Sequence, residues 1–142
     1  MSKVRRFLFL APVERRRLLR AFFIVASVRL GLWIIPFPRF QKLLARVSVP
    51  SRTNCRAAQP TTAQLARDVR IVSSYVPRAT CLTQALAGQA FLAHYGYPAV
   101  VHIGVTTSEG DAKAFQSHAW LESDGSVIIG ESEQPFVPLV TF

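Results

Sequence analysis

The sequence predicts an α+β fold, with helices in the first two thirds of the chain and an antiparallel sheet in the last third. Apolar residues recur at helical spacing as far as Tyr95. After Gly96 the period changes to two, and Val and Ile become frequent, which is typical of strands. Asp124-Gly125 lies between two expected strands and is the strongest short-range signal for a hairpin.

The composition indicates one ordinary globular chain. A length of 142 residues is enough to bury a core, and a hydrophobic content of 50% argues against disorder. The two cysteines, Cys55 and Cys81, do not make a disulfide framework, and no Cys/His cluster has the spacing of zinc ligands. We therefore expect no metal, no cofactor and a reducing, cytoplasmic compartment.

The net charge of +9 is concentrated at the front of the chain. Residues 1–50 hold eleven Lys and Arg against the single acid Glu14, whereas residues 51–142 hold six against seven acids. This division predicts a basic helical segment over residues 1–50, which packs on or precedes a core over residues 51–142.

The basic segment has two open interpretations. It can be a docking surface for an acidic partner, a peptide or an anionic lipid, with residues 1–46 in contact with a membrane surface. It can equally be a helical layer whose arginines are solvated. A nucleic-acid partner is not expected, because the basic residues are not arranged as in a recognition helix.

The front of the chain predicts a long helix. Residues 7–10 resemble the apolar part of a signal peptide, but charged residues 14–17 cut it short, and we expect no secretion. Pro12 favours the start of a helix over residues 13–33. Its apolar stretch, residues 21–28, is shorter than the about 20 residues that a membrane span needs.

Two shorter helices and a loop are predicted next. Pro36 and Pro38 end the long helix, and residues 39–47 follow as an amphipathic helix. Its apolar side consists of Phe40, Leu43 and Leu44. Residues 48–60 form a loop that contains Cys55. Thr61 or Thr62 then caps a helix that runs to about Tyr75, with its apolar face made of Leu65, Val69 and Val72.

Cys81 is predicted to open a helix. Thr80 is a good N-cap, and apolar residues recur at helical spacing over residues 81–95 before Gly96. The positive end of the helix dipole favours the thiolate there, and the free N–H groups can hold an oxyanion. Most free cysteines only fill a gap in a core, so a catalytic role requires a base elsewhere.

The expected hairpin supplies a base with a carboxylate beside it. If Asp124 and Gly125 are the two turn residues, Trp120 faces Ile129 and His118 faces Glu131. Side chains on opposed positions lie about 5 Å apart on one face, so the carboxylate can orient the imidazole. A slip of one residue would move Glu131 to the other face. Taken alone, such a pair is most simply a surface ion pair.

Two other histidines compete for the role of base. His94 lies near the far end of the cysteine helix, about 20 Å from its head at 1.5 Å per residue, and is excluded. His102 is on the first expected strand with no evident carboxylate opposite, so we expect a structural role for it.

These residues resemble a known family. Cys81-Leu82 at a helix start, residues 96–99 before a strand, His118-Ala119-Trp120 and the Asp124-Gly125 hairpin are similar to transglutaminase-like cysteine proteases. The resemblance covers about residues 77–131. It is nearest to the leader peptidase of lasso-peptide biosynthesis, the protease half of the B protein.

The resemblance implies a papain-like core in which a cysteine-bearing helix packs on an antiparallel sheet. It implies Cys81 as nucleophile, His118 as general base and acid, and an acid on the next strand as orienter. The family usually has Asp there, whereas this chain offers Glu131, with Asp124 at the hairpin tip as the alternative. No metal or nucleotide is implied for cleavage.

The implied reaction is removal of a leader from a lasso-peptide precursor, a ribosomally made and modified peptide. The implied partners are the precursor, a separate leader-recognition protein and an ATP-dependent lasso cyclase that closes the macrolactam. Two other classes remain open: an acyltransferase or amidase with the same Cys-His-acid core, and a non-enzymatic module that binds peptides or membrane surfaces.

Overall fold

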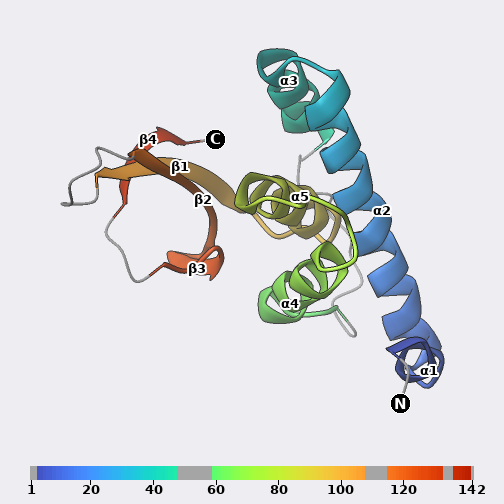
Figure 1. The fold of residues 1–142 in the computed structure, drawn as a ribbon. Helices are drawn as coiled ribbons and strands as arrows, with labels where there is room; N and C mark the ends of the chain where they lie inside the picture. Colours follow the sequence, from blue (N-terminus) through green and yellow to red (C-terminus); the bar gives the residue numbers. More distant parts are fainter. Residues whose placement is uncertain (1–2, 48–58, 108–114, 133–135, 142) are drawn as a thin grey trace.

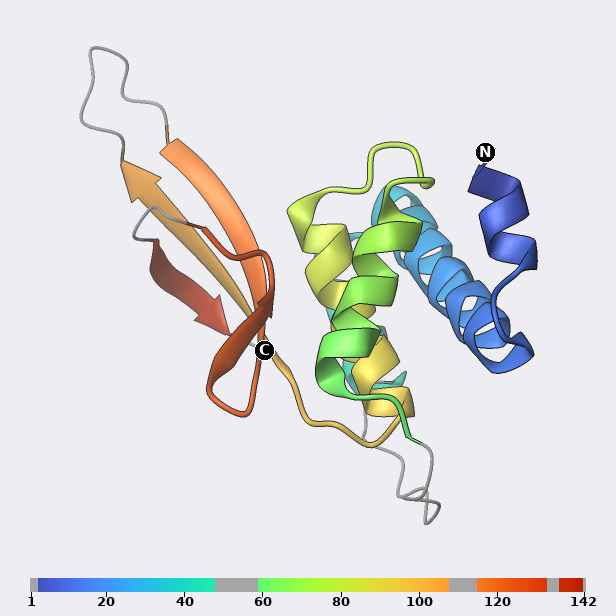
Figure 2. The ribbon, with the colours of Figure 1, turned by 90° about the horizontal axis from the view of Figure 1, so that it is seen from below.

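The computed structural model describes residues 3–47, 59–107, 115–132 and 136–141. Within these ranges the chain forms five helices followed by four strands, and the predicted α+β class is confirmed. The helices gather on one side of the molecule and the sheet on the other (Figures 1 and 2). The predicted division at residue 50 and the loop with Cys55 lie outside the described residues.

The first three helices are α1 (Lys3–Leu8), α2 (Pro12–Ile34) and α3 (Phe37–Val47). α2 confirms the predicted long helix, with Pro12 in its first turn, whereas α1 was not predicted. Phe40 of α3 is buried as expected, but Leu43 is exposed. None of the described helices combines the length and apolarity needed to cross a bilayer.

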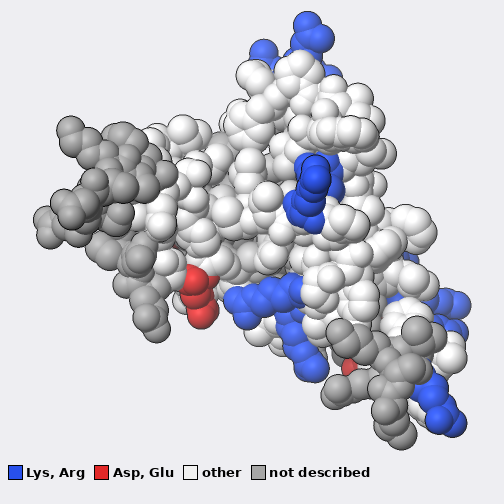
Figure 3. Space-filling model, viewed as in Figure 1, with Lys and Arg blue, Asp and Glu red and all other residues white. Residues whose placement is uncertain are grey.

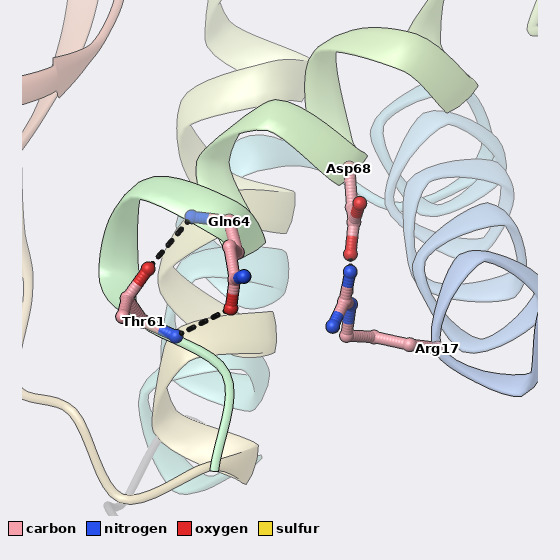
Figure 4. A network of polar contacts seen from close by, with 4 residues as sticks. All are labelled: Arg17, Thr61, Gln64 and Asp68. Atoms are coloured by element: carbon pink, nitrogen blue, oxygen red, sulfur yellow. Dashed lines mark hydrogen bonds and ion pairs between the residues drawn. The ribbon is translucent and has the colours of Figure 1, made fainter. Parts of the chain in front are cut away.

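Helix α4 (Thr62–Ser73) begins with a capping box. The backbone N–H of Gln64 donates to the Thr61 hydroxyl at 3.2 Å, and the Gln64 side chain accepts from the Thr61 N–H at 3.0 Å (Figure 4). The predicted apolar face of this helix is confirmed, because Leu65, Val69 and Val72 are all buried.

An ion pair ties α4 to α2. Arg17 of α2 donates from Nε to the carboxylate of Asp68, and both side chains are largely buried (Figure 4). Burial raises the pKa of the Asp68 carboxyl, and the hydrogen bond and charge of Arg17 offset only part of that rise. The sequence pattern gave no signal for this buried acid, since its partner lies 51 positions away.

Helix α5 (Cys81–His94) lies at the centre of the fold. It packs against α2 and α4 on one side and against the sheet on the other (Figure 1). Its buried residues include Leu86, Phe91 and Leu92, which join the single core cluster shared by helices and sheet. α5 therefore fixes the position of its own first residue relative to the sheet.

The sheet is antiparallel and has the order β3-β2-β1-β4. Its strands are β1 (Val100–Thr107), β2 (Phe115–Ser123), β3 (Ser126–Ile129) and β4 (Val137–Thr141). β1, β2 and the start of β3 agree with the sequence pattern. β4 was not predicted: it is a short edge strand containing Pro138, and it forms by pairing with β1.

The predicted register of the hairpin is correct near the turn and wrong beyond it. Asp124 and Gly125 both have positive φ, 51° and 76°, as a two-residue type I′ turn requires, and Glu122 pairs with Val127. However, Ile129 pairs with Leu121 and not with Trp120, because a bulge intervenes.

Contacts with the helices account for this bulge. The extra residue on β3 is Ile128, whose carbonyl oxygen accepts a hydrogen bond from Arg70 of α4 at 2.6 Å. The shift turns Ile129 inward, where it is buried together with Leu121. A local turn rule cannot include such a contact.

Gly88 sets how closely α5 approaches the sheet. A Cβ at this position would lie 2.6 Å from Ile129 Cδ1 and 2.8 Å from Leu121 Cδ2. We expect Gly88→Val to lower the free energy of unfolding by about 1–3 kcal/mol through overpacking, measured by urea unfolding. His94→Val, at the exposed end of the same helix, is the control and should change little. Equal losses in both variants would contradict the close packing at Gly88.

Candidate functional site

Cys81 occupies the first position of α5, as the sequence predicted. The Thr80 hydroxyl caps the helix by accepting from the Thr83 N–H at 3.3 Å. The Cys81 side chain is half-buried and packs against the core cluster. Because the backbone N–H groups of a first helical turn have no partner within the helix, the sulfur lies where a negative charge is stabilised.

His118 lies on β2, on the face of the sheet that points away from α5. Side chains alternate along a strand, and Ala119 and Leu121 are buried towards the helices. His118 and Trp120 therefore share the opposite face. There the His118 ring stacks on Trp120 at a centroid distance of 6.3 Å and contacts Phe136 at 5.0 Å.

A backbone carbonyl orients the imidazole of His118. Nε2 of His118 lies 2.7 Å from the carbonyl oxygen of Gly130. A carbonyl only accepts, so this hydrogen bond requires the proton on Nε2 and leaves the lone pair on Nδ1. Gly130 has a φ of 83°, and a Cβ there would lie 2.7 Å from the Ala119 carbonyl oxygen. The hairpin rule does not predict this partner, because only the folded hairpin brings Gly130 back over β2.

Glu131 lines the same pocket as His118. This pocket has a volume of about 210 Å³ and is lined by His118, Trp120, Val127, Gly130, Glu131, Ser132 and Phe136. Within the described residues the ion pairs are Arg17–Asp68 and His102–Glu122, so Glu131 makes none with His118. The backbone carbonyl of Gly130, and not the carboxylate of Glu131, is the hydrogen-bond partner of the His118 ring. Asp124 is exposed at the hairpin tip.

Trp120 is directly opposite His102, so no carboxylate is opposite it, as expected, but His102 has a carboxylate partner elsewhere on β2. Its Nε2 lies 3.2 Å from Glu122, and its Nδ1 lies 3.0 Å from the hydroxyl of Thr141. Glu122 is opposite Val100, two pairs along from His102, so it is a diagonal neighbour on the same face that a search for directly opposed residues misses. With both ring nitrogens engaged, His102 links β1, β2 and β4, and the structural role expected for it agrees with these contacts.

The described geometry brings His118 and Glu131 together but leaves Cys81 outside their pocket. The start of α5 lies on the side of the helical layer that faces β2 (Figures 1 and 2). α5 packs on one face of the sheet, whereas His118 projects from the other face, so this structure does not bring the imidazole and the Cys81 sulfur together. The catalytic roles of Cys81 and His118 stay predictions.

A helix that opens with a cysteine and packs on an antiparallel sheet bearing a histidine is the architecture of papain-like and transglutaminase-like proteins. Residues 14–141 match the family model of the transglutaminase-like superfamily, and the chain belongs to this superfamily. The superfamily includes cysteine peptidases and acyltransferases. No curated protein and no solved structure matches the chain.

Proposed function

We propose that this protein is a cysteine peptidase that removes the leader from a lasso-peptide precursor, so that a cyclase can close the macrolactam. The observation that carries the proposal is the position of Cys81 at the capped head of α5, in a chain of the transglutaminase-like superfamily. The precursor, a separate leader-recognition protein and an ATP-dependent lasso cyclase are the partners that this function requires.

The first turn of α5 supports Cys81 as the nucleophile and the backbone amides beside it as the oxyanion site. The Thr80 hydroxyl takes the N–H of Thr83, and the Thr80 carbonyl takes the N–H of Gln84. The amides of Cys81 and Leu82 are thus the donors left at the helix head. In the reaction the Cys81 thiolate attacks the carbonyl between leader and core, and these amides stabilise the oxyanion.

His118 supplies the proton transfers in this proposal. Its Nε2–H is held by the Gly130 carbonyl, so Nδ1 takes the proton of the Cys81 thiol and then gives it to the departing amine of the core. Nδ1 next takes a proton from the water that attacks the thioester and passes it to the Cys81 sulfur as the leader is released. Because His118 projects from the sheet face opposite α5, the reaction requires a rearrangement of β2 that brings the imidazole within hydrogen-bonding distance of the Cys81 sulfur when the precursor binds.

A cleavage assay tests the proposed function directly. The purified full chain is incubated with the precursor and the leader-recognition protein, and the products are identified by mass spectrometry. Free leader and free core are expected. If the leader is instead transferred to an added amine, with little hydrolysis, the protein is an acyltransferase; if the precursor binds and stays intact, the non-enzymatic interpretation is correct.

Alkylation separates a catalytic Cys81 from an ordinary thiol. We expect iodoacetamide to modify Cys81 faster than Cys55, because the head of α5 stabilises negative charge on the attacking sulfur. Cys55 is the internal control. Site-resolved rates are obtained by peptide mass spectrometry over a pH series. Equal rates with the same pH dependence at both cysteines would contradict activation by the helix.

The third catalytic role is proposed for Glu131. Glu131 lines the His118 pocket, and we propose that its carboxylate stabilises the imidazolium formed during the reaction. We expect Glu131→Gln to lower kcat about tenfold to a hundredfold with little change in KM. Asp124→Asn, at the hairpin tip, is the matched control and should leave cleavage unchanged. The reverse result would assign the role to Asp124.

A further inference from the structure

Helix α2 has two apolar faces, and only one of them is covered by described residues. The inner face packs on α4 and α5 through Ala21, Val25 and Val28, all of which are buried. The opposite face is exposed and is made of Leu19, Phe22, Phe23, Leu30, Trp33 and Ile34. We call these six residues the outer face. Phe23 is 66% exposed, Leu30 53% and Trp33 78%.

The outer face is broad and long. Phe22-Phe23 and Trp33-Ile34 are adjacent pairs, and neighbouring residues of a helix point about 100° apart. Such a width exceeds the narrow stripe with which one helix packs against another. From Leu19 to Ile34 the face extends about 22 Å along α2 at 1.5 Å per residue. A flat surface fits this shape better than a single partner helix.

Positive charge borders the outer face at both ends. Arg16 and Arg20 are exposed near the start of α2, and the neighbouring helix α3 carries Arg39, Lys42 and Arg46, also exposed. In Figure 3 blue side chains lie near both ends of α2, and a further blue group lies between them on a largely white surface. Acids are scarce, because Glu14 is the only one among residues 1–50. Aromatic and aliphatic residues beside arginines are the composition of helices that lie in the interface of anionic bilayers.

We propose that the outer face of α2 docks this protein on an anionic lipid surface, with α2 parallel to the membrane plane. The sheet with His118 lies on the far side of α5 from α2, so it would face the aqueous phase and stay open to a peptide (Figure 1). This inference concerns a different surface from the candidate catalytic site and does not depend on peptidase activity.

Co-sedimentation with vesicles tests the proposal. The full chain is mixed with vesicles of phosphatidylcholine alone or of phosphatidylcholine with phosphatidylglycerol. We expect binding to the anionic vesicles, reduced by high salt. Phe23→Ser/Leu30→Ser should weaken it at least about tenfold, since two large apolar side chains no longer enter the interface. Val137→Ser/Leu139→Ser on β4, where both residues are 64% exposed, is the matched control and should bind as the parent does.

Trp33 provides a second measurement that does not depend on affinity. In a Trp120→Phe background Trp33 is the only tryptophan, and its emission should shift to the blue and resist acrylamide when anionic vesicles are added. No vesicle binding by the parent protein, or equal binding by Phe23→Ser/Leu30→Ser, would overturn the proposal. A third outcome would also overturn the proposal: the parent does not bind vesicles but is captured by a purified leader-recognition protein or cyclase, and Phe23→Ser/Leu30→Ser is not captured. That result would assign the outer face to a protein partner.

Discussion

Replacement of Cys81 by alanine is expected to abolish leader removal, with cleavage at least about 10⁴-fold slower than in the parent protein. Without the thiol no covalent acyl intermediate can form, and the amides at the helix head have no attacking group to assist. The measurement is the rate of leader release followed by mass spectrometry. Circular dichroism and the melting temperature should stay close to those of the parent, because Cys81 is only half-buried.

His118→Ala should give the same loss, because no other described histidine can replace it. His102 has both ring nitrogens engaged, and His94 lies at the opposite end of α5 from Cys81. His94→Ala is therefore the matched control and should cleave at the parent rate. Cys55→Ala serves the same purpose for the thiol. Cleavage retained by Cys81→Ala or by His118→Ala would remove the case for a thiol peptidase, whatever the superfamily.

Replacement of Arg17 by methionine is expected to lower the free energy of unfolding at neutral pH by about 3–5 kcal/mol. The methionine fills similar space but leaves the Asp68 carboxylate buried without its cation. Urea unfolding gives the free energy. Arg16→Met, at an exposed neighbouring position, is the control and should change stability by less than about 0.5 kcal/mol.

The stability loss caused by Arg17→Met is expected to depend on pH in a definite direction. Burial raises the pKa of Asp68 above its value in the unfolded chain, so its contribution to stability is greatest in acid and is lost as pH rises through the raised pKa. Loss of Arg17 removes the interactions that lower this pKa and so raises it further. The penalty of Arg17→Met should therefore shrink as pH falls, and Asp68→Asn should relieve it at neutral pH. A penalty that is constant with pH would mean that the charge of Asp68 is not its cause.

The two functional proposals concern separate surfaces of the fold. The sheet face with His118 and the pocket beside Glu131 point away from the helices, whereas the exposed apolar face belongs to α2. Since α5 packs against both α2 and the sheet, it connects them mechanically. A protein held on a membrane through α2 could therefore still present the strand face to a partner that delivers the precursor.

The sequence by itself determined the parts of the molecule that depend on neighbours in the chain. The helix starts at Pro12, Thr61 and Thr80 and the Asp124-Gly125 turn follow from the conformations and hydrogen bonds of adjacent residues, and so does the placement of Cys81 at a helix head. The change of period after Gly96 likewise predicted the sheet.

Only the tertiary structure decided what depends on segments far apart. The Arg70–Ile128 hydrogen bond and the burial of Ile129 against Gly88 shift the hairpin register, so that a carbonyl of Gly130 and not a carboxylate meets His118. β4 forms because its backbone pairs with the free edge of β1. The free energy of these contacts comes from packing between distant segments, and a pattern read along the chain does not contain it.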